Sequence, residues 1–372
     1  MNYRNTWAEI NLSAIGYNIQ QLKNLLPNDR KMMAVVKSNG YGHGSVEVAK
    51  VALEQGVDFL MVALLEEAVK LRRHGITVPI LVVGRVPPEH AEVAADLDIT
   101  LTVFQVEWIH AIKNKQFRKK LKVHLEFETG MNRTGICTFD ELEAIVKEIK
   151  NLNHIEITGC YTHFATADEK DSKHFKTQKE RYEKMLHELT ELYPKSLITH
   201  IGNSAAGIQY PEQMLQYTRF GVSIYGLYPS KEIRALQNVD LRQAFSLYSE
   251  LIQVKKVKAG EFVGYGATYV AKEDEWIGTI PIGYGDGWSR ALTGFHVLIN
   301  GKKMPIVGRI CMDVMMVKLD DRYEVGQKVT LIGKDHDSVI EMDDVADYLG
   351  TINYEIPCMI TERVPRKYIK PS

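Results

Sequence analysis

Eight short apolar runs, each followed by a stretch of helical character, occupy the segment from about Lys31 to Tyr225. Continuous apolar runs are typical of strands buried on both faces, as in parallel sheets with helical crossovers. Eight such pairs are the number that closes a (β/α)8 barrel. The expected strands are Met32–Val36, Phe59–Ala63, Pro79–Val83, Thr100–Val103, Leu121–Phe127, Ile155–Cys160, Leu197–Ile201 and Tyr217–Tyr225.

An open, doubly wound sheet is the alternative for the same alternation. Its phosphate fingerprint would follow the first strand, where Gly40-Tyr41-Gly42-His43-Gly44 has the wrong glycine spacing. The barrel is therefore favoured. The amphipathic segments expected between its strands include Val46–Gln55, Leu65–His74, Val106–Asn114, Asp140–Lys150 and Thr177–Leu192.

After about Pro229 the pattern changes, because helix-like stretches become rare and turn signals such as Asn300-Gly301 separate β-rich runs. We predict an α/β fold: a TIM-type (β/α)8 barrel over residues 11–232, followed by a mainly β C-terminal domain over residues 233–372 that includes a strand from residues 1–10. The expected β runs are Leu251–Val257, Trp276–Pro281, His296–Ile299, Pro305–Val307, Val314–Leu319 and Lys328–Ile332, with a short helix near Asp343–Leu349.

Charge and composition exclude several classes of partner. The chain has 372 residues, with 46 basic and 47 acidic side chains and a formal net charge of −1. This balance argues against nucleic-acid and membrane-surface partners, which favour clustered positive charge. No window approaches a membrane span and no apolar signal segment opens the chain, so we expect a cytoplasmic enzyme.

The sequence contains no motif typical of a catalytic metal site or of a serine hydrolase. The four cysteines are irregularly spaced, and neither a His-Glu-x-x-His nor a Gly-x-Ser-x-Gly motif occurs. We therefore expect no catalytic metal.

Lys37 directly follows the first apolar run and precedes the glycine-rich segment Ser38–Gly44. A free amine is scarce at neutral pH, since the ordinary lysine pKa is about 10.4, but partial burial lowers that pKa. A neutral amine at a strand end is what a Schiff base with an aldehyde cofactor requires. Taken alone, Lys37 is better explained as a surface lysine at a strand end, and only the rest of the chain reverses that preference.

In a barrel, chemistry is expected where strands end and loops begin. Asn203-Ser204-Ala205 follows the seventh strand, and Arg219-Phe220-Gly221-Val222 lies on the eighth. Small residues there can present N–H groups and a hydroxyl to a phosphate, although a serine cap and a packing glycine would look the same. Other candidates at strand ends are Tyr41, Arg133 and His163.

The β-rich segment contains two glycine-tyrosine turns, Gly264-Tyr265-Gly266 and Gly283–Trp288, the latter with Tyr284. Flanking glycines leave a tyrosine ring accessible, and a tuned phenol can donate or accept a proton. Such turns are also common as plain structure. Arg309–Asp313 follows a strand and could present backbone donors to a substrate carboxylate.

Together these segments resemble the alanine racemase family over nearly the full length. The resemblance rests on Ala34–Gly44, Thr129–Arg133, Asn203–Ala205, Arg219–Gly221, Gly264–Gly266, Gly283–Trp288, Arg309–Asp313 and Asn353–Glu355. It implies a pyridoxal 5′-phosphate (PLP) enzyme, an isomerase that interconverts L- and D-alanine and supplies D-alanine for peptidoglycan. It also implies a head-to-tail homodimer whose active sites combine the barrel of one chain with the β domain of the other.

The resemblance further implies a role for each site residue. Lys37 would bind PLP covalently and, with Tyr265 of the partner subunit, exchange protons at the two faces of the substrate Cα. The phosphate would be bound by Tyr41, Ser204, Gly221, Val222 and Tyr354, with Asn203 nearby. Arg219 would face the pyridine nitrogen, Arg133 the phenolic oxygen and the substrate, and His163 would link Tyr265 to Arg219. Met312 would bind the substrate carboxylate, and Tyr284 would narrow the entrance.

The chemistry of these side chains agrees with such roles. Racemisation needs proton removal on one face and delivery on the other, which suits a lysine and a tyrosine. An arginine does not protonate a pyridine nitrogen, because its pKa exceeds 12. Decarboxylases that resemble this fold place a carboxylate there instead, so Arg219 favours a racemase.

Glu126 departs from the family pattern, because many members have a carboxylated lysine seven residues before the arginine of the Met131–Arg133 segment. We hypothesise that Glu126 supplies the negative charge and orients Arg133 by a charge-assisted hydrogen bond. Its shorter reach also allows a bridging water or anion.

Three alternatives stay open, and the nearest is another racemase. A racemase of broader specificity would also accept serine, although Tyr284 and Tyr354 favour a narrow pocket. A non-catalytic PLP carrier would resemble the barrel alone and leave residues 233–372 without purpose. A decarboxylase would release carbon dioxide.

Overall fold

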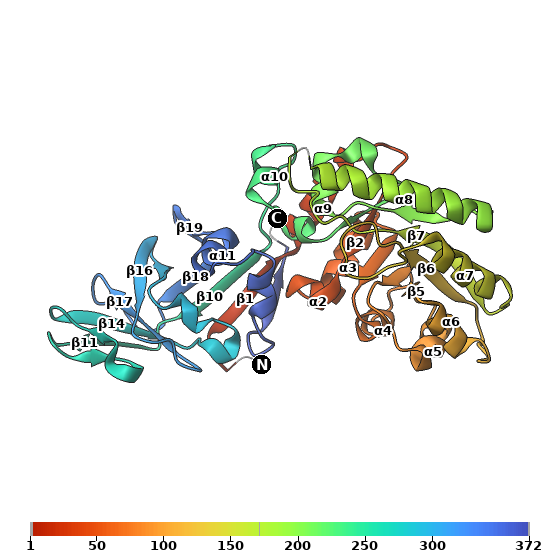
Figure 1. The fold of residues 1–372 in the computed structure, drawn as a ribbon. Helices are drawn as coiled ribbons and strands as arrows, with labels where there is room; N and C mark the ends of the chain where they lie inside the picture. Colours follow the sequence, from red (N-terminus) through yellow and green to blue (C-terminus); the bar gives the residue numbers. More distant parts are fainter. Residues whose placement is uncertain (1–2, 171, 371–372) are drawn as a thin grey trace. The chain divides into compact units, whose positions relative to one another are not determined.

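The computed structural model describes residues 3–170 and 172–370, which form two compact units (Figure 1). The barrel unit comprises Ile15–Gly40 and Ser45–Arg242, and the β-rich unit comprises Met1–Ala14, Tyr41–Gly44 and Gln243–Ser372. The domain boundary after residue 232 stays a prediction.

The barrel unit is built on eight parallel strands in sequence order, closed by pairing of the last strand with the first. This closure confirms the predicted (β/α)8 fold. The strands are β2 (Lys31–Val35), β3 (Phe59–Val62), β4 (Ile80–Val82), β5 (Thr100–Val103), β6 (Leu121–Glu126), β7 (Ile155–Tyr161), β8 (Ile198–His200) and β9 (Tyr217–Phe220).

Helices follow the strands and cover the outside of the barrel (Figure 1). Helix α7 shows why they form where they do. Thr138 Oγ1 accepts a hydrogen bond from Glu141 N at 3.2 Å, and Glu141 Oε2 in turn accepts one from Thr138 N at 3.3 Å. Such a reciprocal cap stabilises a helix start by about 1 kcal/mol. The helices are α1 (Leu12–Leu25), α3 (Ser45–Glu54), α4 (Leu65–Arg73), α5 (Ala91–Asp96), α6 (Val106–Ile112), α7 (Phe139–Lys150), α8 (Lys173–Leu192), α9 (Ser204–Gln209) and α10 (Lys231–Ala235).

A histidine inside the barrel is accommodated by a glycine on the next strand. The pairing of β6 with β7 shifts register between Val123 and His124. A Cβ on Gly159 would lie only 2.6 Å from His124 Nε2. Gly159 thus leaves room for the fully buried imidazole of His124.

The prediction of a single strand over Tyr217–Tyr225 is wrong in its second half. β9 ends at Phe220, and Val222–Tyr225 forms a 3₁₀ helix, η3. Gly221 breaks the strand with φ −111° and ψ −98°, and its N–H donates to Ser204 Oγ rather than to a neighbouring strand.

The β-rich unit contains one large sheet in the order β11-β14-β17-β16-β15-β18-β10-β1-β20, with β19 paired to β18. The strands are β1 (Thr6–Asn11), β10 (Phe245–Glu250), β11 (Gln253–Val257), β14 (Glu275–Ile280), β15 (His296–Ile299), β16 (Lys302–Val307), β17 (Met315–Leu319), β18 (Lys328–Asp335), β19 (Ser338–Ile340) and β20 (Arg366–Ile369). A small hairpin, β12 (Phe262–Val263) with β13 (Tyr269–Val270), and two helices, α11 (Met342–Leu349) and α12 (Glu355–Met359), complete the unit.

Strand β1, near the N-terminus, pairs antiparallel with β10 and parallel with β20, the last strand of the chain. The sequence did not predict β10 or β20. β20 reads Arg-Lys-Tyr-Ile, which has little apolar character of its own. Its strand conformation comes from pairing with residues more than 350 positions away.

Candidate functional site

Lys37 lies two residues after the end of β2 and begins a turn of the opposite hand to an ordinary helix. Ser38, Asn39, Gly40 and Tyr41 all have positive φ, between 48° and 63°. Left-handed backbone costs a residue with a Cβ roughly 1–2 kcal/mol, so three such residues among four consecutive positions need external support. The half-buried Lys37 side chain is therefore presented by a strained backbone.

Helix α4 supplies that support. Ser38 N donates to Glu67 Oε1 at 2.5 Å, while Glu67 Oε2 accepts from Ala63 N at 2.9 Å and Leu64 N at 3.1 Å. Asn39 Oδ1 accepts from Lys70 Nζ at 3.0 Å. One glutamate thus holds the first amide of the turn and the start of its own helix.

Arg219 on β9 is buried, and its terminal nitrogens are saturated by protein acceptors. Nη1 donates to His200 O at 2.8 Å and His200 Nδ1 at 3.0 Å. Nη2 donates to Thr162 O at 2.8 Å and to His163 Nδ1 at 3.2 Å, with Ile201 O at 3.3 Å. No described residue accepts a hydrogen bond from Nε. Burial lowers the pKa of Arg219 to about 10, which leaves it a cation at neutral pH.

The arginine determines the tautomers of a buried histidine chain. Because Arg219 can only donate, His200 Nδ1 accepts, and His200 Nε2 must carry the hydrogen. His200 Nε2 lies 2.9 Å from His124 Nδ1, so His124 accepts there and carries its own hydrogen on Nε2. That Nε2 is buried without a hydrogen-bond partner. Burial lowers the pKa of His124 to about 3 and that of His200 well below its usual range, so both are neutral.

The His163 side chain lies among positively charged groups. Burial, followed by the charges of Arg219, Arg133 and Lys37, lowers the pKa of His163 well below its usual range. Its Nδ1 accepts from Arg219, so the neutral ring carries its hydrogen on Nε2. His163 is therefore a donor at Nε2.

Glu126 and Arg133 face each other without a direct hydrogen bond. Arg133 Nη2 lies 3.9 Å from Glu126 Oε1, too long for the charge-assisted hydrogen bond that we expected. The glutamate is shorter than a carboxylated lysine, which explains the gap. Glu126 instead accepts from Thr134 Oγ1 at 2.9 Å. Burial raises its pKa, opposed by Thr134, Arg133 and Arg219.

The two predicted phosphate segments lie together. Ser204 Oγ accepts from Gly221 N at 2.9 Å, which joins the start of α9 to the end of β9. Asn203 caps α9 by accepting from Ala206 N at 3.0 Å. Two donors are left at this junction. The Ser204 hydroxyl hydrogen can still be donated, and no described residue accepts from the N–H of Val222, the first residue of η3.

In the β-rich unit, Tyr41 and Tyr354 lie close, with ring centroids 6.2 Å apart. Burial raises the pKa of Tyr41, so its phenol stays protonated. A protonated phenol can donate a hydrogen bond to an anion.

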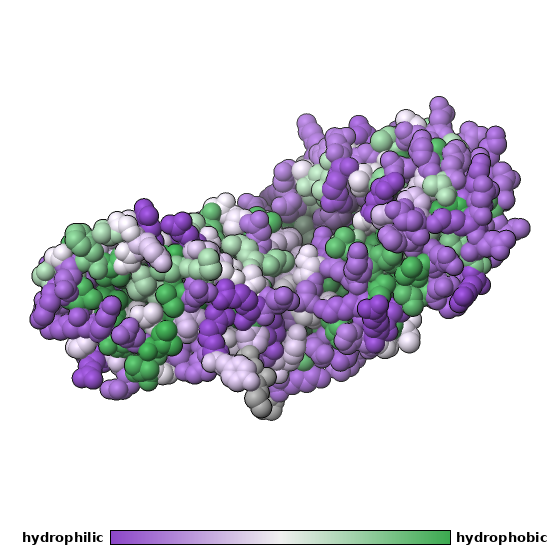
Figure 2. Space-filling view, turned by 90° about the horizontal axis from the view of Figure 1, so that it is seen from below, coloured by the Kyte–Doolittle hydropathy of each residue, from purple (hydrophilic) through white to green (hydrophobic). Residues whose placement is uncertain are grey.

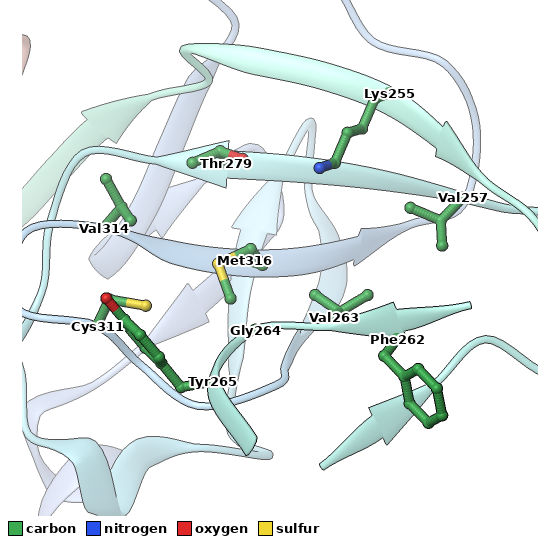
Figure 3. A pocket seen from close by; sticks show the side chains of 10 residues that line it. All are labelled: Lys255, Val257, Phe262, Val263, Gly264, Tyr265, Thr279, Cys311, Val314 and Met316. Carbon is green, nitrogen blue, oxygen red and sulfur yellow. The ribbon is translucent and has the colours of Figure 1, made fainter. Parts of the chain in front are cut away.

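Tyr265 borders a cavity of about 410 Å³ in the β-rich unit. Figure 3 shows its ring directed toward Cys311 and Val314 rather than away from the cavity. The side chain is 73% exposed. Gly264 and Gly266 on either side have φ of 78° and 72°, which glycine adopts readily. The turn thus displays a phenol that this unit leaves largely uncovered.

Tyr284 and Met312 belong to two loops that hydrogen bond to each other. Tyr284 N donates to Cys311 O at 3.0 Å, and Gly285 N donates to Met312 O at 2.9 Å. Met312 N has no acceptor among the described residues. Both side chains are exposed. A backbone donor of this kind is what a substrate carboxylate could use.

The structure adds residues that the sequence analysis missed. Thr162 O and His200 bind Arg219, and His124 extends that contact. Gln178 on α8 donates to His163 O at 3.0 Å. His200 ends β8, so the rule that chemistry lies at strand ends could have found it, whereas His124 inside β6 gave no such signal.

The described residues lack both a metal-binding cluster and a membrane-spanning helix. They contain no group of three or more histidine, cysteine or acidic side chains arranged to hold a metal ion. In the same residues, no helix has the length and apolar character needed to cross a bilayer.

Comparison with known proteins covers both units. Residues 10–229 match the family model of the alanine racemase N-terminal domain, and residues 244–368 match that of the C-terminal domain. Alanine racemase of Anoxybacillus flavithermus is 49% identical over 99% of this chain and 96% of its own length.

Solved structures agree. That of alanine racemase from Bacillus anthracis with bound L-Ala-P has a TM-score of 0.97 at 45% identity, covering 100% of this chain and 96% of that one. A histidine racemase from Leuconostoc mesenteroides is also similar, with a TM-score of 0.89, 30% identity, and coverage of 100% and 99%. With both family domains matched and nearly half of all residues identical to a full-length relative, this chain belongs to the alanine racemase family.

Proposed function

We propose that the protein is an alanine racemase, an isomerase that interconverts L- and D-alanine. One observation carries the proposal beyond family membership: Arg219 is a buried cation whose terminal nitrogens are bound by carbonyls and neutral histidines. No carboxylate of a described residue hydrogen bonds to it. A decarboxylase would need an acid at this place, so the arginine favours racemisation.

The residues present fit PLP as the cofactor. Arg219 Nε has no described acceptor and can donate to a pyridine nitrogen without protonating it. The Ser204 hydroxyl and the Val222 N–H are donors suited to a phosphate. By the resemblance, Asn203, Gly221, Tyr41 and Tyr354 would also contact it. Lys37 would hold the aldehyde carbon. When bound, PLP withdraws electrons from the amino-acid Cα and acidifies its hydrogen.

Lys37 of the barrel unit and Tyr265 of the β-rich unit would transfer the protons. Lys37 is half-buried at a strand end, and Tyr265 is exposed on its turn. We assign them to opposite faces of the substrate Cα, with Tyr265 provided by the partner subunit. His163 donates from Nε2 because its Nδ1 accepts from Arg219, so it can stabilise Tyr265 after the phenol gives up its proton.

Two groups would hold the substrate carboxylate. Met312 N–H lacks a described acceptor, and the Arg133 side chain is 53% exposed with only a long contact to Glu126. Together they supply a backbone donor and a guanidinium, a combination suited to a small amino acid. Tyr284 would narrow the entrance.

We propose a homodimer, because Tyr265 is assigned to the partner subunit and lies in a different unit from Lys37. Exposed apolar side chains in the β-rich unit, among them Phe262, Val270 and Met312, are candidates for burial against a second copy. Figure 2 shows apolar patches on the surface of that unit. We place the enzyme in the cytoplasm, supplying D-alanine for peptidoglycan.

The direct test is to mix purified protein and PLP with L-alanine and follow the loss of optical rotation. The native protein should racemise alanine, and Lys37→Ala should lose both activity and the yellow colour of the bound cofactor. Lys50→Ala, an exposed lysine on α3, is the matched control and should behave as native. Release of carbon dioxide, or a colourless native protein, would contradict the proposal.

Specificity is tested with the same assay on serine, lysine and histidine. Alanine should be turned over faster than the others if Tyr284 and Tyr354 narrow the pocket. Equal rates with serine would indicate a racemase of broader specificity, the alternative that the shared fold permits.

A further inference from the structure

Four charged residues of the β-rich unit, Arg4, Asp286, Asp313 and Arg363, form a continuous ionic chain, which we call the ionic clamp. It joins the N-terminal segment, the turn that carries Tyr284, the loop that carries Met312 and the segment before β20. We propose that the ionic clamp positions Met312 N–H for the substrate carboxylate. This inference rests on the proposed function.

Asp286 is the centre of the clamp. Its side chain is 0% exposed. Oδ2 accepts from Arg4 Nη1 at 2.9 Å and from Gly283 N at 3.0 Å, while Oδ1 accepts from Arg4 Nη2 at 2.8 Å. A buried carboxylate is unfavourable unless its charge is matched, and here a two-pronged arginine matches it. The Gly283–Trp288 turn is thereby held to the chain's N-terminal segment.

Arg363 connects the turn that carries Tyr284 to the loop that carries Met312. Its Nε lies 3.4 Å from Asp286 Oδ1, and its Nη2 lies 2.6 Å from Asp313 Oδ1. Arg363 O also accepts from Arg4 Nη2 at 3.0 Å. One guanidinium therefore couples the buried acid of the Tyr284 turn to the acid that directly follows Met312.

Backbone contacts place Met312 between these two charges. Gly285 N holds Met312 O at 2.9 Å, and Asp313 on the next residue is held by Arg363. A Cβ on Gly283 would collide with Met312 O and Cys311 O, so the two loops touch along their backbones. The Met312 N–H shares its peptide plane with Cys311 O, which accepts from Tyr284 N at 3.0 Å. With both that carbonyl and the next peptide held, the Cys311–Met312 peptide cannot rotate freely. Its N–H keeps one direction.

Breaking the ionic clamp should affect KM rather than kcat. The clamp contacts neither Lys37 nor Tyr265, so proton transfer should be nearly unchanged when it is broken. Binding of the carboxylate should weaken. Loss of a directed donor to a charged group typically weakens binding about 10-fold.

The test compares Arg363→Met and Asp313→Asn with Lys302→Met. The control removes an exposed ion pair of equal length, Lys302–Asp320 at 2.6 Å, on β16 of the same unit. We expect the two clamp variants to raise KM for L-alanine about 10-fold with kcat within about threefold. Inhibition by propionate, which has the carboxylate and methyl group but no amine, should weaken in parallel.

A double variant and an activity-independent measurement complete the design. Arg363→Met with Asp313→Asn should cost no more than Arg363→Met alone, because Arg363→Met already removes the Arg363–Asp313 contact. Hydrogen exchange at Tyr284 N and Gly285 N should quicken in Arg363→Met and not in Lys302→Met. If Arg363→Met does not fold, Arg4→Met and Asp313→Asn carry the same tests.

Three outcomes would overturn the inference: unchanged KM and propionate inhibition in the clamp variants, an equal change in Lys302→Met, or a fall in kcat with constant KM. Native protein that does not racemise alanine would instead refute the proposed function. The exchange measurement would still report whether the clamp holds the two loops.

Discussion

Arg219 donates through Nη1 to both the carbonyl oxygen and Nδ1 of His200, at 2.8 and 3.0 Å. This pairing keeps the guanidinium plane fixed and forces the hydrogen of His200 onto Nε2. The charge at the barrel mouth therefore stays on the arginine, because neither neighbouring histidine is protonated at neutral pH.

Arg219→Lys should lower kcat at least about 10-fold and destabilise the fold by about 2–4 kcal/mol. A lysine has no planar fork and cannot reach His200, Thr162 and His163 at once, which leaves buried acceptors unsatisfied. Racemisation kinetics and urea unfolding measure the two effects. Arg85→Lys, an exposed arginine hydrogen bonded to Gln105, should change neither. Full activity in Arg219→Lys would show that the fork is dispensable.

The stability of the protein should fall in acid partly because of His124. Its pKa is about 3 in the folded protein and about 6.5 when unfolded. Above about pH 6.5 both states are neutral, so His124 adds no pH dependence. Between about pH 6.5 and 3 only the unfolded state binds the proton, so stability falls as the pH falls.

His124→Gln keeps an acceptor for His200 but does not titrate. We expect its unfolding free energy, measured in urea, to depend less on pH below about 6.5, by up to about 1.4 kcal/mol per pH unit. His187→Gln, at an exposed histidine on α8, should retain the native pH dependence. Identical slopes for His124→Gln and native protein would refute the prediction.

Glu67→Gln should impair the left-handed turn after Lys37. An amide has one oxygen where the carboxylate uses two, so either Ser38 N or the pair Ala63 N and Leu64 N loses its acceptor. We expect a loss of about 1–2 kcal/mol in stability and a fall in kcat of about 10-fold. The adjacent exposed Glu66→Gln is the control. Native kinetics in Glu67→Gln would mean that the turn holds without it.

Glu126→Gln should raise KM for alanine about 3- to 10-fold, since it removes the negative charge 3.9 Å from Arg133. The contact from Thr134 Oγ1 should survive, because an amide oxygen also accepts. Steady-state kinetics and PLP titration measure the effect. Glu143→Gln on the exposed side of α7 should be neutral. Unchanged kinetics would rule out a role for Glu126 in holding Arg133.

The sequence predicted the local structure best where burial on both faces left an uninterrupted apolar run. β5 and β15 match their predicted limits, and most other barrel strands differ by one or two residues. Prediction failed where partners are distant. β20 is polar and depends on β1, and the run through Tyr225 concealed a break at Gly221.

Candidate residues follow the same division. Lys37, His163 and Arg219 could be named because they lie at or near strand ends, where barrel chemistry is expected. The Arg4–Asp286 contact joins residues 282 positions apart, and the partners of Arg219 on β9 come together only through the pairing of β7, β8 and β9. Sequence alone determined the alternation of elements and the kinds of reactive groups, since both are local. Only the tertiary structure decided the tautomers, the left-handed turn and the ionic clamp, because each depends on atoms that meet after the chain has folded.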